Sequence, residues 1–71
     1  MAEGRGRRGL VMLQNLEVGA KVLLKGDITA EVTGNPKDGS WIYVKYLTHP
    51  KDPSLEGSEE LAFADDVVDE L

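Results

Sequence analysis

The sequence predicts an all-β fold, a strongly bent meander of about five short antiparallel strands that forms a partly open barrel. Apolar and polar residues alternate with a period of two over residues 28–33, which is typical of a half-buried strand. Residues 40–48 are rich in aromatic and β-branched side chains, which suit a pleated sheet. Turn-forming glycine, asparagine and aspartate separate these short runs. Helical periodicity is confined to the acidic end, residues 64–71, which is too short to form a stable helix alone.

The length and composition limit the kinds of support and of site that the chain can have. A chain of 71 residues makes one domain with one small core. It has no cysteine, which excludes disulfides and cysteine-bound zinc, and leaves oligomerisation as the remaining support. The one histidine, His49, is not accompanied by a recognisable nucleophile and orienting acid. We therefore expect a protein that is not an enzyme and has no cofactor or metal.

The alternation of apolar and polar residues predicts the first strands. Ordered structure is expected to begin near residues 13–18, where Leu16 and Val18 have the spacing of one strand face. The next strand, residues 21–25, is expected to turn Val22 and Leu24 inward. Gly26-Asp27 then predicts a type II′ hairpin turn. In the following strand, residues 28–33, the inward side chains are Ile28, Ala30 and Val32.

The strand over residues 40–48 has two partly apolar faces. We expect one face to fill the core, with side chains Ile42, Val44 and Tyr46. The opposite face would then lie outside, with side chains Trp41, Tyr43, Lys45 and Leu47. A slip of one residue would reverse the two faces, placing Trp41 and Tyr43 in the core and Tyr46 outside.

The C-terminal third is expected to form a long loop, a strand and a helical turn. Residues 49–59 are rich in proline and glycine and predict the loop. The strand over residues 60–64 is expected to turn Leu61 and Phe63 inward. A single helical turn would then begin with Asp65 as its cap. The final apolar side chains would cover the end of the barrel, and these are Val67, Val68 and Leu71.

Charge divides the chain into a basic tail and an acidic body. Residues 1–11 are expected to be a disordered tail with three arginines, Arg5, Arg7 and Arg8, and residues 12–71 the folded domain. Because the ordered domain is expected to start near Met12, this residue is an alternative first residue of the protein. From residue 10 onward, five lysines face twelve carboxylates, which repel nucleic acid. With no apolar run near the roughly 20 residues of a membrane span, we expect a cytoplasmic protein without membrane contact.

The order of parts resembles the SH3-like small β-barrels, especially the Tudor and KOW-type branch. The resemblance covers roughly residues 16–71 and rests on five segments, which are 18–22, 30–32, 37–39, 41–44 and 60–68. The last segment looks like two closing strands joined by a short helical turn. This resemblance implies a fold and not an activity. The first hairpin turn has no aromatic side chain for a Tudor-type cage, and KOW-type modules are usually basic.

Two further resemblances concern function. The layout is similar to the small plasmid-type dihydrofolate reductases, whose pore-lining strand has a Val-Gln-Ile-Tyr run. Residues 60–63 (Glu-Leu-Ala-Phe) have neither the glutamine nor the tyrosine, which argues against that activity. Some acidic SH3-like proteins are antirepressors that occupy a DNA-binding surface, which is conceivable here from charge alone.

The first functional hypothesis is a non-enzymatic interaction module. It would bind a protein partner through the outward face of residues 40–48 and the long loop that follows, and the acidic surface favours a basic partner. The contact residues on the strand would be Trp41, Tyr43, Lys45 and Leu47. The loop over residues 49–59, the N-terminal segment or a second copy of the chain could instead cover that face. The acidic residues from Glu56 onward are interpreted as a solvated surface, with a basic partner or a loosely held divalent cation as the alternatives. Residues 52–60 lack the alternating ligand spacing of a calcium loop.

Two other hypotheses belong to different classes. One is a nucleic-acid-associated protein that uses Arg5, Arg7 and Arg8 together with exposed aromatic rings that stack on single strands. The other is a subunit of an oligomeric enzyme whose site forms only between chains.

Overall fold

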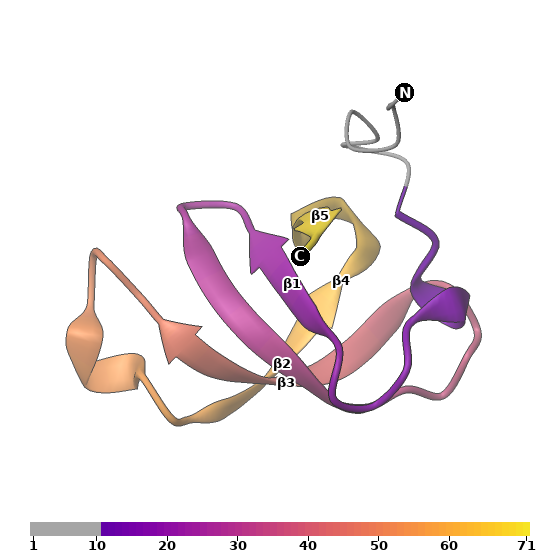
Figure 1. Cartoon of the computed structure of the whole chain (residues 1–71), viewed down its shortest axis with the longest axis horizontal. Coiled ribbons are helices and arrows are strands. Elements are labelled where there is room, and N and C mark those ends of the chain that lie inside the picture. The colour runs from indigo at the N-terminus through magenta and orange to yellow at the C-terminus, as the bar shows by residue number, and fades with distance from the viewer. Residues whose placement is uncertain (1–10) are drawn as a thin grey trace.

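The computed structural model describes residues 11–71. They form one antiparallel sheet with the strand order β4-β3-β2-β1-β5 (Figure 1). The strands are β1 (Lys21–Leu24), β2 (Ile28–Gly34), β3 (Trp41–Thr48), β4 (Glu59–Phe63) and β5 (Val67–Glu70). Three 3₁₀ turns accompany them, η2 (Leu13–Asn15), η3 (Pro53–Leu55) and η4 (Ala64–Asp66). The all-β prediction is confirmed, and the sheet does not close into a barrel, because β4 and β5 remain its two edges.

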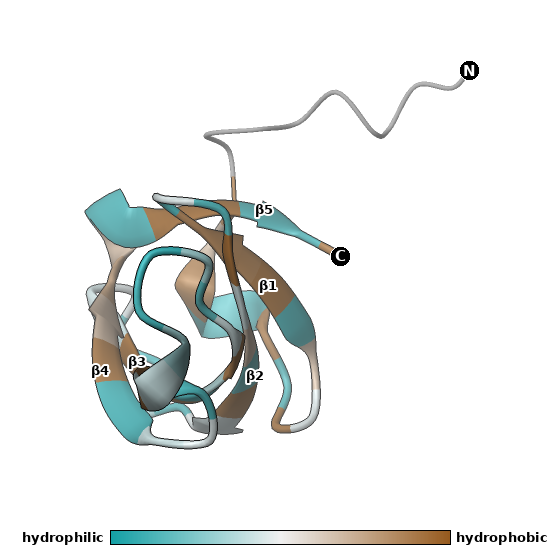
Figure 2. Ribbon diagram, turned by 90° about the vertical axis from the view of Figure 1, so that its left-hand side faces the viewer, coloured by the Kyte–Doolittle hydropathy of each residue, from teal (hydrophilic) through white to brown (hydrophobic). Residues whose placement is uncertain are grey.

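The sheet curls around a single apolar core. Figure 2 shows β4 on one side of the centre and β1 with β2 on the other. The buried side chains come from all five strands and from the N-terminal segment, and they are Leu13, Leu16, Val22, Leu24, Ala30, Val32, Ile42, Val44, Ala62 and Val67. Val11, which we expected in the tail, packs against this core at its margin. The predicted tail otherwise lies outside the described residues.

The β1–β2 hairpin follows the predicted alternation. Val22 and Leu24 are buried on β1, as are Ala30 and Val32 on β2, while Ile28 packs partly buried against them. The predicted type II′ turn is wrong. Gly26 and Asp27 both have positive φ, 85° and 61°, whereas a type II′ turn needs a positive φ only at its first central residue. Glycine and aspartate are among the residues that tolerate this left-handed backbone.

Strand β3 turns the predicted face inward. Ile42 and Val44 are fully buried, and Tyr46 packs half-buried against the core. The alternative register, with Trp41 and Tyr43 in the core, is therefore excluded. The β2–β3 ladder contains two irregularities, between Thr29 and Ala30 and between Val32 and Gly34, which bend the two strands together.

Strand β4 reverses the predicted facing. Ala62 is buried at 2% exposure, whereas Leu61 and Phe63 are 48% and 52% exposed, so the prediction that these two fill the core is wrong. The physical reason is the register. Ala62 lies opposite the buried Ile42, and side chains opposite each other on antiparallel strands share a face of the sheet.

The two ends of the domain also depart from expectation. Leu16 is buried but Val18 is 66% exposed, because residues 18–19 form a turn instead of a strand, closed by the hydrogen bond from the N–H of Ala20 to the carbonyl of Glu17 at 3.0 Å. The predicted helical turn after β4 is confirmed as η4, but Asp65 does not cap it, since the N-cap position is Phe63 without a side-chain hydrogen bond. The chain then continues as β5 beside β1. Val67 is buried there, Val68 is half-buried, and Leu71 is exposed and does not cover the core.

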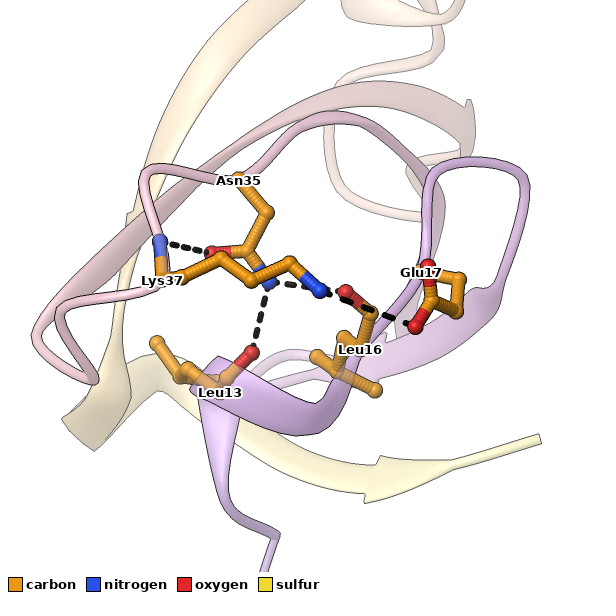
Figure 3. A network of polar contacts seen from close by, with 5 residues as sticks. All are labelled: Leu13, Leu16, Glu17, Asn35 and Lys37. Carbon is orange, nitrogen blue, oxygen red and sulfur yellow. Dashed lines mark hydrogen bonds and ion pairs between the residues drawn. The ribbon is translucent and has the colours of Figure 1, made fainter.

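Asn35 joins the N-terminal segment to the β2–β3 connection (Figure 3). Its Nδ2 donates to the carbonyl oxygens of Leu13 and Leu16, at 2.7 and 2.8 Å, and its Oδ1 accepts from the backbone N–H of Lys37 at 2.8 Å. Lys37 also lies 3.6 Å from Glu17, but this ion pair is exposed and adds little stability. One half-buried amide therefore fixes the segment that delivers Leu13 and Leu16 to the core.

The loop before β4 is held by its own hydrogen bonds. The backbone N–H of Asp52 donates to Nδ1 of His49 at 3.1 Å, and Ser58 Oγ donates to the carbonyl of Leu55 at 2.7 Å. The ring of His49 also lies 5.3 Å from the ring of Tyr46. His49 therefore has a structural role at the start of the loop.

Candidate partner-binding surface

The β3–β4 register brings four large apolar side chains together on the outer side of the sheet. Trp41 lies opposite Phe63, and Tyr43 lies opposite Leu61. We call these four residues the outer apolar face. Sequence reasoning found Trp41 and Tyr43 but missed Leu61 and Phe63, because alternation was assigned to β4 without knowledge of its register.

The outer apolar face is exposed in its central part. Tyr43 is 49% exposed, close to the values of Leu61 and Phe63, and Trp41 is partly buried beside it. The rings of Trp41 and Tyr43 meet edge to face, with centroids 4.9 Å apart and planes at 89°. Such a contact adds about 0.5–1.5 kcal/mol beyond area burial and holds both rings in place. The loop over residues 49–59 therefore does not cover this face.

Gly34 makes room for Tyr43 on the neighbouring strand. A Cβ atom at residue 34 would lie 3.0 Å from Cδ2 of Tyr43. The glycine thus lets the ring of Tyr43 lie against the backbone of β2. This close approach explains why a glycine stands in the last position of a strand.

Of the other two predicted contact residues, Lys45 belongs to this surface and Leu47 does not meet β4. Lys45 is exposed and lies opposite Glu59 on β4 and Glu31 on β2. Leu47 is half-buried, and the β3–β4 ladder has already ended at Lys45. Leu47 also has no paired residue on β2, because the β2–β3 register shifts between Thr29 and Ala30.

Carboxylates border the outer apolar face at both ends of β4. A shallow hollow of about 360 Å³ is lined by Tyr43, Leu61, Glu59 and Glu60. A second hollow, of about 390 Å³, lies between Phe63, Asp65 and the turn at Gly39 and Ser40. Exposed apolar side chains with an acidic rim are suited to a partner that is both apolar and basic.

A more enclosed cavity lies on the inner side of β4. It has a volume of about 190 Å³ and apolar walls, with one basic and one acidic residue beside them, and its lining residues are Leu24, Ile28, Tyr46, Leu61, Ala62, Lys25 and Asp66. Burial raises the pKa of the Tyr46 hydroxyl above its ordinary value, and the negative charges of Glu60 and Asp66 raise it further. The hydroxyl is therefore neutral at physiological pH and can donate a hydrogen bond.

Three further expectations concern the basic tail, metal ions and membrane contact. Arg5, Arg7 and Arg8 lie outside the described residues. Among residues 11–71, no three acidic or histidine side chains come close enough to hold a metal ion together. Within the same range, no helix has the length and apolar composition needed to cross a membrane.

Comparisons with protein-family models, with curated proteins and with solved structures gave no match for this chain.

Proposed function

We propose that this chain is a non-enzymatic protein-interaction module that binds a basic partner through the outer apolar face. The observation that carries the proposal is the exposure of Tyr43, Leu61 and Phe63, each near one half, side by side on two paired strands. In a domain this small, they would be worth more to the fold if buried, and contiguous exposed apolar side chains mark interaction sites.

The chemistry of the face resembles that of binding hot spots. Tryptophan and tyrosine are enriched among the residues that dominate binding energy, because they bury a large area at a small entropic cost. Trp41 and Tyr43 are already fixed by their edge-to-face contact, so little side-chain freedom is left to lose on binding. The acidic rim then selects among partners by charge.

Fold type and location in the cell are two further expectations from the sequence. We propose that the domain is of the SH3-like type, for which the five antiparallel strands and the short turn η4 between β4 and β5 are the supporting features. We also propose a cytoplasmic location, supported by the absence of cysteine.

The test compares capture of lysate proteins by the wild-type chain and by a double variant, Tyr43→Ser with Phe63→Ser. The matched control is Leu71→Ser, because Leu71 is 65% exposed and follows β5 at the opposite edge of the sheet. We expect the control to retain the captured proteins and the double variant to lose them, while thermal unfolding shows that both remain folded. Identical capture by all three chains would contradict the proposal.

A further inference from the structure

Strand β4 has an open edge whose backbone groups point away from the sheet. The N–H of Ala64 donates to the carbonyl of Ser40 at 2.9 Å, and the N–H of Tyr46 donates to the carbonyl of Ser58 at 3.0 Å. Hydrogen-bonded pairs alternate along an antiparallel ladder, so the even-numbered residues of β4 bond to β3. The N–H and C=O groups of Glu59, Leu61 and Phe63 therefore face outward. Within residues 11–71, β3 is the only strand paired with β4.

The partly open cavity described above lies along the same strand, on its inner side. Leu61 and Ala62 of β4 form one wall, and Leu24 and Ile28 of the β1–β2 hairpin form another. A strand added beside β4 would alternate its side chains between the two faces of the sheet. A residue opposite Ala62 would then point inward, toward this cavity.

We propose that the open edge of β4 accepts an extended, basic segment of a partner protein as an additional strand, with one apolar side chain of that segment in the cavity beside Ala62. This inference rests on the proposed function and specifies how the partner binds. Backbone hydrogen bonds to the edge supply the affinity, and alternate side chains supply the selectivity.

Charge complementarity identifies the occupant as a basic partner and not a second copy. Every charged residue from β4 to the C-terminus is acidic, and these are Glu59, Glu60, Asp65, Asp66, Asp69 and Glu70. Pairing β4 of one copy with β4 or β5 of another would bring these carboxylates together, and like charges on paired strands are destabilising. A segment with lysine or arginine opposite Glu59 and Glu60 removes this repulsion.

The geometry specifies the pattern of the partner segment. For an antiparallel strand, the residues opposite Phe63 and Leu61 lie on the outer side and are apolar. The residue between them lies opposite Ala62 and is the apolar side chain that enters the cavity. Basic residues follow, opposite Glu60 and Glu59. A probe with this pattern is the peptide acetyl-Lys-Val-Leu-Val-Lys-Lys-Thr-amide, in which the leucine lies opposite Ala62.

Methylating single backbone nitrogens of this peptide tests the mode of binding. The second valine lies opposite Leu61, so its N–H faces β4, whereas the N–H of the leucine faces away. We expect the full chain to bind the unmodified peptide, with slower exchange of the Leu61 and Phe63 amides in NMR spectra. Methylation of the valine nitrogen should weaken binding at least tenfold, and methylation of the leucine nitrogen less than threefold.

A second variant tests the cavity. Ala62→Leu places a larger side chain where the peptide leucine would lie, and we expect it to weaken binding at least tenfold, as replacing the peptide leucine by alanine also should. If Ala62→Leu unfolds the domain, the two methylated peptides and the alanine peptide decide the question with the wild-type chain.

The outcomes separate this inference from the proposed function. Equal weakening by the two methylated peptides, or none by either, would overturn strand addition. If the peptide bound without strand addition but failed to bind the variant Tyr43→Ser, the outer apolar face would remain a protein-binding surface. Failure of the unmodified peptide to bind at millimolar concentration would also overturn strand addition, while leaving the lysate experiment to decide the function.

Discussion

At the scale of single residues, Asn35 shows how one polar side chain can organise a small core. Its amide satisfies the carbonyl groups of Leu13 and Leu16, two residues that supply buried leucines. The carbonyl of Leu13 also accepts from the backbone N–H of Leu16 at 3.0 Å, so loss of the amide would leave the Leu16 carbonyl without its donor, which costs about 1–3 kcal/mol. The side-chain amide of Asn35 therefore contributes more to stability than its place in a turn-forming sequence suggests.

Replacing Asn35 by aspartate should destabilise the domain by about 1–3 kcal/mol at neutral pH. The carboxylate keeps the acceptor for Lys37 but loses the donor and places negative charge against two carbonyl oxygens. Urea unfolding gives the free energy of the change. The matched control is Asn15→Asp, an exposed asparagine in the turn η2, for which we expect a change of less than about 0.5 kcal/mol. An equal effect of the two changes would contradict the role of Asn35.

Tyr46 gives the fold a sensitivity to alkaline pH. Because burial and two neighbouring carboxylates raise its pKa in the folded state, the unfolded chain loses the hydroxyl proton first, near pH 10.0. The stability contributed by the neutral hydroxyl is then fully present below pH 10.0 and is lost as the pH rises through the folded-state pKa. We expect wild-type stability to fall above pH 10.0 and Tyr46→Phe to fall less.

Urea unfolding at pH 8 and pH 11 measures this difference, with Tyr43→Phe as the control for removal of a phenol elsewhere on β3. We expect Tyr43→Phe to keep the wild-type fall. A fall of equal size in Tyr46→Phe and the wild type would show that Tyr46 does not cause it.

At the scale of elements, β3 and β4 show what alternation can and cannot predict. The existence of β3 was predictable because it is a long β-rich run flanked by clear turns. The expected facing, with Ile42 and Val44 inward, competed with the reversed register, and the structure decides for it. For β4, the pattern Glu-Glu-Leu-Ala-Phe favours burial of the larger side chains. The structure buries the small Ala62 instead.

The facing of β4 depends on pairing, which the sequence of β4 alone does not contain. The turn in residues 53–58 sets which residue of β4 lies opposite Ile42, and that residue is Ala62. A signal was available in principle, because the outward Trp41 and Tyr43 require outward partners on the next strand. This signal can be used only if the β3–β4 register is known, and the long loop between the two strands leaves the register undetermined. Half of the outer apolar face was therefore found from the sequence and half was missed.

The reversed facing of β4 predicts a contrast in stability. Leu61→Thr and Phe63→Thr should each change the free energy of unfolding by less than about 0.5 kcal/mol, because these side chains are half-exposed and threonine suits a strand. Ile42→Ala should cost about 2–5 kcal/mol, because Ile42 is fully buried. Thermal and urea unfolding of the three variants checks the contrast. A large loss of unfolding free energy in Phe63→Thr would show that Phe63 belongs to the core and not to the binding surface.

At the scale of the whole molecule, the sheet formed by residues 11–71 has two edge strands, β4 and β5, and a strong negative charge. Residues 11–71 contain five lysines and twelve carboxylates. The overall all-β topology was predictable because turns and alternation are local signals, whereas closure of the sheet depends on how far β4 and β5 curl toward each other. Exposed edges invite pairing between copies, and charged residues on them are a known protection. Under the proposal made above, like charges on the acidic edges disfavour pairing between copies and leave β4 accessible to a basic strand.

Reversing the charge of one edge should remove this protection. In the double variant Glu59→Lys with Glu60→Lys, β4 becomes complementary to the acidic β5 of another copy, which contains Asp69 and Glu70. Because β4 and β5 are different surfaces, such pairing is head-to-tail and can continue from copy to copy. We expect the apparent mass in light scattering to rise with concentration, and to fall again in about 0.5 M salt, which screens exposed charges.

The control for this change is Glu17→Lys with Glu56→Lys, which alters the net charge equally but lies outside β4 and β5. It should keep the wild-type mass at every concentration, because neither edge gains a complementary charge. Association of both double variants would attribute the effect to net charge alone. If neither double variant associates, the β4 edge is closed to pairing for a reason other than its carboxylates. The carboxylates of β4 would then give no advantage to a basic partner strand.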